Sequence, residues 1–183
     1  MLKWLIRRGI SAFERRWGYD ATYMHEVVEK AGVGAMLPMN GLQKLGAYRR
    51  DIPKEAYYAA AIVASKAADC GPCLQLGISM ADAAGVAPSV VRAALRDDRE
   101  GLPESARLAY DLARSVVARD GSGEAARTEI LRRYGHRALV SLAYAMVVAN
   151  AYPTLKYALG YGHTCARVRV GGEDVTLEAA AAR

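Results

Sequence analysis

The sequence predicts an all-α fold, and three observations support this class. Apolar residues recur at intervals of three and four along most of the chain, alternating β-branched runs are nearly absent, and proline or glycine punctuates the periodic segments. The chain has 183 residues, of which 52% are hydrophobic and 24% are charged, enough apolar material for one buried core. We therefore expect a multi-helix bundle that forms a single domain over residues 1–183.

Residues 1–52 are predicted to form a helical extension ahead of the core. One face of its first helix carries apolar residues at helical spacing, namely Leu2, Ile6, Ile10, Phe13 and Trp17. We expect this basic amphipathic helix to pack on its own domain or on a neighbouring subunit. The alternative, a docking element for a partner or a membrane surface, is disfavoured. A second helix is predicted from Asp20, its expected N-cap, to about Gly32. Gly34, Pro38 and Gly41 then indicate irregular chain.

Residues 53–162 are predicted to form the core of the bundle. A proline or glycine marks the limits of most of its helices, which are expected over residues 54–68, 69–85, 88–95, 103–120, 125–134 and 136–159. Pro153 predicts a kink in the last of them. The uncharged stretch from Ala138 to Leu155 approaches the length of a membrane span, but it contains Ser141 and Asn150, so we interpret it as a buried helix.

Residues 163–183 are predicted to form a tail. The alternation over residues 167–170, followed by Gly171 and Gly172, predicts a small hairpin or a frayed terminus. His163, beside Cys165, lies either near the paired cysteines or on the surface, and the surface is the favoured position.

The segment Asp69-Cys70-Gly71-Pro72-Cys73 carries the chemistry. It lies at the predicted start of a helix, where unpaired N–H groups and the helix dipole stabilise a thiolate. The C-x-x-C spacing also brings the two sulfurs within disulfide reach, so the sequence predicts a redox-active disulfide between Cys70 and Cys73. Helix electrostatics favour Cys70 as the more acidic thiol. Asp69 either orients a proton at the pair or caps the helix, and the capping role is favoured.

Two other uses of this cysteine pair are disfavoured. Thioredoxins contain the same four residues, but there the motif follows a buried strand, whereas an Ala-rich helix-forming segment precedes Cys70. A structural zinc site needs a second pair of ligands, and His163 and Cys165 form only one His-x-Cys. We expect neither a metal nor another cofactor.

The order of features from residue 53 to 162 is specific: a helix leads into a C-x-x-C between two helices, followed by the segments Leu76–Val86 and Ala106–Asn150. This order resembles the carboxymuconolactone decarboxylase and alkylhydroperoxidase D-like family. The resemblance implies an all-helical bundle assembled as a homo-oligomer, a trimer, a hexamer or a similar ring. It also implies a cysteine pair that reduces hydroperoxides or a partner protein's disulfide, with Cys73 as the attacking thiolate and Cys70 as the resolving one.

Two departures from the family's motif bear on this function. The peroxidase motif continues as C-x-x-C-x-x-x-H, and the histidine position is Gly77 here; the family's glutamate position is Tyr58. Glu55 lies one helical turn before Tyr58 on the same face, and we expect it to reach the site. The sequence therefore predicts a thiol-dependent peroxidase or disulfide reductase. The alternative is a non-peroxidatic decarboxylase-like or ligand-binding protein.

Charge and the first residues of the chain limit the other function classes. The chain has 25 Lys and Arg against 19 Asp and Glu, a net charge of +6, but no block of five cationic residues, so we do not expect nucleic-acid binding. The segment before Arg7 is too short for the apolar region of a secretory signal, and a cytoplasmic location is expected.

Overall fold

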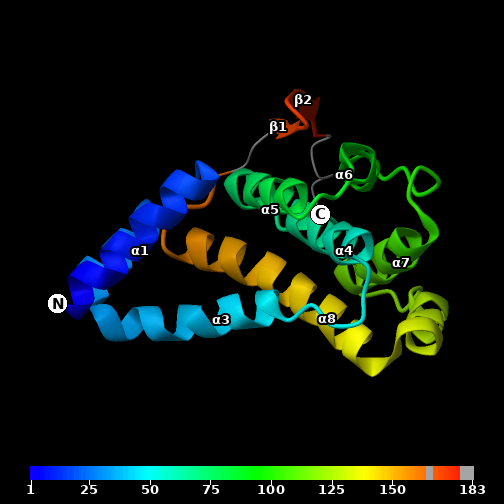
Figure 1. Cartoon of the computed structure of the whole chain (residues 1–183), viewed down its shortest axis with the longest axis horizontal. Helices are drawn as coiled ribbons and strands as arrows, with labels where there is room; N and C mark the ends of the chain where they lie inside the picture. Colours follow the sequence, from blue (N-terminus) through cyan, green and yellow to red (C-terminus); the bar gives the residue numbers. More distant parts are fainter. Residues whose placement is uncertain (164–166, 178–183) are drawn as a thin grey trace.

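A computed structural model of the chain describes residues 1–163 and 167–177 and is mostly helical (Figure 1). The helices in these residues are α1 (Leu2–Trp17), α2 (Thr22–Glu26), α3 (Leu37–Ala47), α4 (Lys54–Ala67), α5 (Gly71–Ala83), α6 (Pro88–Leu95), α7 (Glu104–Ala118) and α8 (Glu124–Ala158). A π-helical turn (η1, Val27–Ala31) and a 3-10 turn (η2, Val33–Met36) connect α2 to α3, and strands β1 (Arg167–Val170) and β2 (Glu173–Thr176) form an antiparallel hairpin. The predicted all-α class is confirmed, and of the two alternatives for residues 167–172 the structure contains the hairpin.

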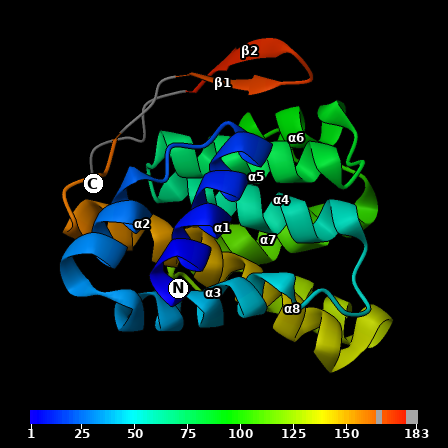
Figure 2. The same cartoon turned by 60° about the vertical axis from the view of Figure 1, so that its left-hand side comes forward.

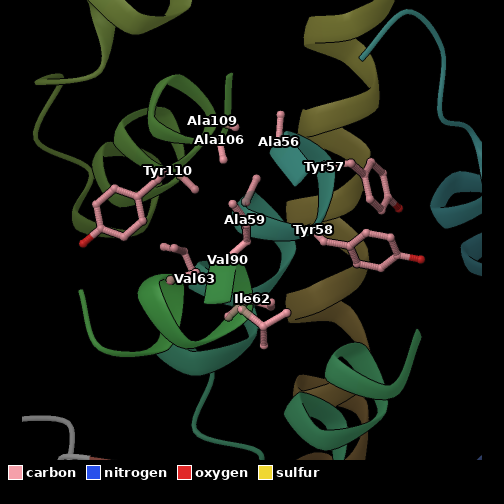
Figure 3. Packing of buried hydrophobic residues seen from close by; sticks show 14 of the residues in the cluster. Ala56, Tyr57, Tyr58, Ala59, Ile62, Val63, Val90, Ala106, Ala109 and Tyr110 are labelled. Atoms are coloured by element: carbon pink, nitrogen blue, oxygen red, sulfur yellow. The ribbon is translucent and has the colours of Figure 1, made fainter. Parts of the chain in front are cut away.

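Helix α4 is the centre of the main core. It is rich in alanine, and nine of its 14 residues are buried, because α5, α6, α7 and α8 all pack against it. Figure 3 shows Ala56 and Ala59 of α4 on the side of Ala106 and Ala109 of α7, and all four residues are almost completely buried. Small side chains on both helices let the two backbones approach closely. The C-terminal end of α4, which leads to the cysteines, therefore has a fixed position in the core.

The loop between α3 and α4 is tied to α8 by one buried hydroxyl. Ser141 is completely buried, and its Oγ accepts a hydrogen bond of 2.8 Å from the backbone N–H of Arg50. The same Oγ lies 2.8 Å from the carbonyl oxygen of Arg137 and 3.1 Å from that of Arg50, so its single proton is shared between two acceptors. This bond holds the loop on the main core.

Asp97 joins α4 to the loop between α6 and α7. Its carboxylate accepts hydrogen bonds from Lys66 Nζ at 2.8 Å, Tyr110 Oη at 3.0 Å and Arg114 Nη1 at 3.3 Å, and Lys66 Nζ also donates to the carbonyl oxygen of Leu95. Burial acts to raise the pKa of Asp97, but the hydrogen bonds from Lys66 and Tyr110 and the two positive charges outweigh it, so the pKa lies below its usual value.

A second apolar cluster holds α1, α2 and α3. Its α1 face is the predicted one, with Ile6, Ile10, Phe13 and Trp17 packed together with residues of the segments that follow. The cluster rests on Leu76 of α5 and on the C-terminal part of α8, and α3 runs alongside α8 (Figures 1 and 2). The expectation that α1 packs on its own domain is correct for this face.

The predicted irregular chain around Gly34, Pro38 and Gly41 is wrong, because α3 begins at Leu37. Pro38 lies in the first turn of α3, where its missing N–H has no intrahelical acceptor and therefore removes no bond. Burial of Met39 and the packing of α3 along α8 offset the low helix propensity of Gly41.

The predicted second helix is correct in extent, since α2 and η1 together reach Ala31 and Gly32 is the C-cap. The predicted N-cap is wrong by one residue: Ala21 is the N-cap, and the Asp20 side chain before it accepts a hydrogen bond from the N–H of Thr22.

Helix α8 contains the two helices that were predicted around residue 135. The backbone leaves helical geometry at Gly135, which has φ 77° and ψ −178°, and not at Pro153. Among the described residues, α8 alone is long and apolar enough to cross a membrane, a property that it shares with core helices of soluble proteins. One of its faces is indeed buried, with Leu142 and Ala145 in the main core, while Val147 on another face is 50% exposed.

Candidate functional site

Cys70 and Cys73 are joined by a disulfide where α4 passes into α5, as their spacing predicted. Their Cα atoms lie 5.3 Å apart, within the usual range for a disulfide. Cys70 is the N-cap residue of α5 and is 1% exposed, whereas Cys73 lies in the first turn and is only partly buried. The two sulfurs therefore differ in access: an external reagent reaches Cys73 more readily than Cys70.

Asp69 ends α4 and does not cap α5. It has a left-handed backbone (φ 48°), a conformation that Asp and Asn tolerate better than most residues, and its N–H donates to the carbonyl of Lys66. The expected N-cap role is wrong, because Cys70 occupies that position and α5 has no side-chain cap. Asp69 remains next to the pair through the backbone, and its carbonyl oxygen accepts a hydrogen bond of 2.7 Å from Tyr157 Oη.

The chain that leaves α8 packs on the cysteine turn. The carbonyl oxygen of His163 accepts a hydrogen bond of 3.1 Å from the N–H of Gly71. The ring of Tyr157 lies so close to Gly162 that a Cβ added there would be 2.1 Å from Cδ1, so this position requires glycine. The His163 side chain is exposed as expected, but its backbone lies at the pair. Cys165 lies outside the described residues.

The hairpin is attached to α5 two residues after Cys73. The side-chain amide of Gln75 donates to the carbonyl of Arg169 at 3.1 Å and accepts from the Arg169 N–H at 2.7 Å. A side-chain amide that pairs with both backbone groups of one residue imitates a strand partner and fixes β1 on α5. The first two turns of α5 are thus hydrogen-bonded both to the end of the segment that leaves α8, at His163, and to strand β1, at Arg169.

Gly77 lies one helical turn after Cys73 and leaves open space beside it. A Cβ built on Gly77 meets no other atom within 4 Å. Residues four apart face the same side of a helix, so a side chain at this position would lie beside the Cys73 sulfur. This is the position of the histidine in the peroxidase motif.

Glu55 does not belong to this site. The preceding residue, Lys54, donates through Nζ to the carbonyl oxygens of Ala84 and Gly85 at 3.3 Å and 2.6 Å, which places the start of α4 at the far end of α5. A helix of 13 residues is about 20 Å long. Because α4 and α5 form an antiparallel hairpin whose turn holds the cysteines, each step back along α4 moves a side chain further from them. The expectation that Glu55 reaches the pair is therefore wrong.

A buried lysine against the second apolar cluster was not expected from the sequence. Lys156 is 3% exposed; its Nζ donates to Tyr19 Oη at 3.3 Å and lies 5.0 Å and 5.4 Å from the ring centres of Tyr19 and Tyr23. Burial lowers the pKa of Lys156. Hydrogen bonds from Thr22 lower the pKa of nearby Asp20, and the charge of Lys156 adds to that effect. The only signal in the sequence was a lysine one turn after Tyr152 at the end of an apolar helix.

Neither a cluster of metal ligands nor a similar known protein adds information about the function. In residues 1–163 and 167–177, no three His, Cys, Asp or Glu side chains gather as a metal ion would require. Comparisons with protein-family models, with curated proteins and with solved structures return no match.

Proposed function

We propose that the protein is a thiol–disulfide oxidoreductase in which the Cys70–Cys73 pair cycles between dithiol and disulfide. The observation that carries the proposal is the unequal access of two bonded sulfurs at the start of one helix, with Cys70 buried and Cys73 partly exposed. Dithiol exchange needs one sulfur that meets the partner and a second that is held close behind it. This arrangement supplies both.

In the reductive direction, the Cys73 thiolate attacks one sulfur of a partner disulfide, and the partner's other sulfur leaves as a thiolate. The Cys70 thiol then loses its proton and attacks Cys73 Sγ. The bond between Cys73 and the partner breaks, and the second partner sulfur leaves. Two electrons pass from the pair to the partner, which takes up two protons, and the pair ends as the disulfide seen here.

Helix α5 supplies the electrostatic part of this step. Its dipole and first-turn N–H groups favour a sulfur anion. The N–H of Gly71 is already bound to the carbonyl of His163, and Pro72 has none. In the described part of the chain, the N–H of Cys73 is therefore the first-turn donor left, and an N–H at the third helical position points at the side chain of the N-cap residue, Cys70. The helix thus favours an anion on Cys70, whereas the greater exposure of Cys73 supports Cys73 as the sulfur that attacks the partner.

The same geometry favours disulfide exchange over hydroperoxide reduction. Reduction of a hydroperoxide releases an alkoxide that needs a proton, and a positioned acid assists that step. Here the position beside Cys73 is Gly77, and Glu55 lies at the other end of α5. In thiol–disulfide exchange the leaving group is a thiolate, which needs no positioned acid, so a disulfide is the substrate class that we propose.

The test is mass spectrometry of the reduced protein, with Cys165→Ser as the background, after addition of a small aromatic disulfide or an organic hydroperoxide. We expect the pair to lose two hydrogens on reaction with the disulfide. The additional change Cys70→Ser should trap a mixed disulfide on Cys73, and Cys73→Ser should react no faster than an unfolded thiol. Fast formation of a sulfenic acid on Cys73 with the hydroperoxide would instead establish a peroxidase. If the pair reacts with neither reagent faster than a free thiol does, the disulfide is only a structural link, and a ligand-binding bundle is the function that remains.

We also propose that the protein is a homo-oligomer. The exposed face of α8 carries Val140 and Val147, which are 38% and 50% exposed, on the same side of the helix. Exposed apolar side chains at helical spacing are typical of an interface, and most assemblies of identical chains are closed and symmetric.

A further inference from the structure

One corner of the molecule exposes several large apolar side chains together. Leu2, Trp4 and Leu5 of α1 are 60%, 59% and 55% exposed, and Leu37 at the start of α3 is 62% exposed. Figures 1 and 2 show the first turn of α1 beside the start of α3. We infer that this N-terminal corner, defined by Leu2, Trp4, Leu5 and Leu37, docks on an anionic lipid surface. The inference is independent of the proposed redox function.

The face of α1 that carries Leu2 and Leu5 is not the face that packs on the protein. The side chains that hold α1 on the protein are those in the second apolar cluster, such as Ile10 and Phe13. Leu2, Leu5, Gly9 and Ala12 follow one another at intervals of three and four on a neighbouring face, and all four are exposed. A Cβ at Gly9 meets nothing within 4 Å. This second face lies along the helix without a partner in the described parts of the chain.

The charge around the corner favours lipid with negative headgroups. Helix α1 contains five Lys and Arg against one Glu, so this helix holds +4 of the chain's net +6. Arg8 lies over the ring of Trp4 at 5.4 Å, and Arg15 and Arg16 are exposed on the same helix. Lys3 and Arg7 share the single carboxylate of Glu29, which leaves one positive charge in that group.

The same positive charge argues against a second copy of this chain as the partner that covers the N-terminal corner. Two copies joined through this corner would bring together two α1 helices of +4 each. A lipid surface presents negative charge over an apolar layer, and a helix with leucine and tryptophan on one face and arginine beside it is suited to that boundary. Trp4, with a polar N–H on an apolar ring, is of the type found at the headgroup level.

The test measures binding of the full chain to vesicles of phosphatidylcholine with or without about 30% phosphatidylserine. The change Trp17→Phe leaves Trp4 as the fluorescent reporter, because the chain has two tryptophans. We expect co-sedimentation and a blue shift of Trp4 emission with the anionic vesicles, little of either with the neutral ones, and loss of binding in high salt.

Variants separate the apolar contribution from the charge. Leu2→Ser together with Leu5→Ser should lower the partition coefficient about tenfold or more. Arg8→Gln together with Arg15→Gln should lower it by a similar factor on anionic vesicles and leave the weak binding to neutral vesicles unchanged.

Matched controls lie elsewhere on the surface. Val116→Ser removes an apolar side chain of α7 that is 49% exposed, and Arg96→Gln with Arg119→Gln removes two exposed charges outside residues 1–50. These changes should alter binding less than about twofold, because the groups lie away from the corner. The inference is overturned if the chain does not bind anionic vesicles, or if the controls reduce binding as much as the corner variants. It is also overturned if the leucine variant changes the mass of the protein in solution and not its lipid binding, because a second copy would then cover the corner.

Discussion

Replacement of Gly77 by histidine tests whether a side chain at position 77 fits beside the Cys73 sulfur. The position lies in the middle of α5, and a Cβ there meets nothing within 4 Å. An imidazole four residues after Cys73 would face the same side, with the two Cβ atoms about 6 Å apart. We expect the variant to fold and the added ring to lower the pKa of the Cys73 thiol.

The position of residue 77 sets the size of the expected shift in the pKa of Cys73 and of the expected change in stability. Two unit charges about 6 Å apart attract by roughly 1.4 kcal/mol at an effective dielectric constant of about 40, between the surface and bulk values, which corresponds to about one pH unit in a titration midpoint. Gly77→Ala is the control, since it fills the helix without adding charge. Alanine should stabilise α5 by about 0.8 kcal/mol and raise Tm by about 2–4 °C, because glycine in a helix loses more backbone entropy on folding.

The assay is the rate of alkylation of Cys73 as a function of pH, in a background of Cys70→Ser and Cys165→Ser. The midpoint should fall in Gly77→His, by at most about one pH unit and by that much where the imidazole is still protonated as the thiol titrates, and stay where it is in Gly77→Ala. A histidine variant that unfolds at a lower temperature than the wild type, or that alkylates with an unchanged midpoint, would refute the placement of Gly77 in open space beside the sulfur.

Three further predictions concern the rest of the fold. Ser141→Ala should cost about 0.5–1.5 kcal/mol in chemical denaturation, because it removes the hydrogen bond between the buried hydroxyl and the N–H of Arg50; a stability equal to that of the wild type would contradict that bond. The pKa of Asp97 is below its unfolded value of about 3.9, so its contribution to stability is complete above that value and is lost as the pH falls through the folded pKa. Asp97→Asn should therefore be less stable than the wild type at neutral pH, and the difference should shrink between about pH 5 and pH 2; a constant difference would contradict it. Val140→Glu with Val147→Glu should reduce the mass measured by light scattering to that of one chain, whereas an unchanged mass would place any interface elsewhere.

Periodicity predicted most of the helices because it reports local geometry. The segments that become α4, α6 and α7 each begin after or at a proline and repeat apolar residues at helical spacing, and the structure contains them close to the expected limits. Helix α3 was missed because the local signals of Gly34, Pro38 and Gly41 were weighed without the tertiary contact that decides the outcome. Packing along α8 is invisible in an isolated segment.

The cysteine pair could be predicted from the sequence, but its surroundings could not. The spacing of Cys70 and Cys73 defines the pair on its own, whereas the place of Glu55 depends on the direction of a helical hairpin. A residue one turn before another shares its face but lies about 5 Å further along the axis, and here that step leads away from the turn. Tyr157 and the carbonyl of His163 reach the cysteine turn from the end of α8 and the chain after it, and such long-range contacts leave no local pattern in the sequence.

The most direct test of the central claim is a redox titration of the Cys70–Cys73 disulfide in the Cys165→Ser protein. The fraction of disulfide would be followed by mass spectrometry across a series of thiol and disulfide buffers. A pair that exchanges electrons with partners should titrate reversibly as a two-electron couple between about −270 and −120 mV, the range of thiol–disulfide oxidoreductases. A potential below about −300 mV, or a disulfide that is reduced only when the protein unfolds, would show a structural link and contradict the proposed function.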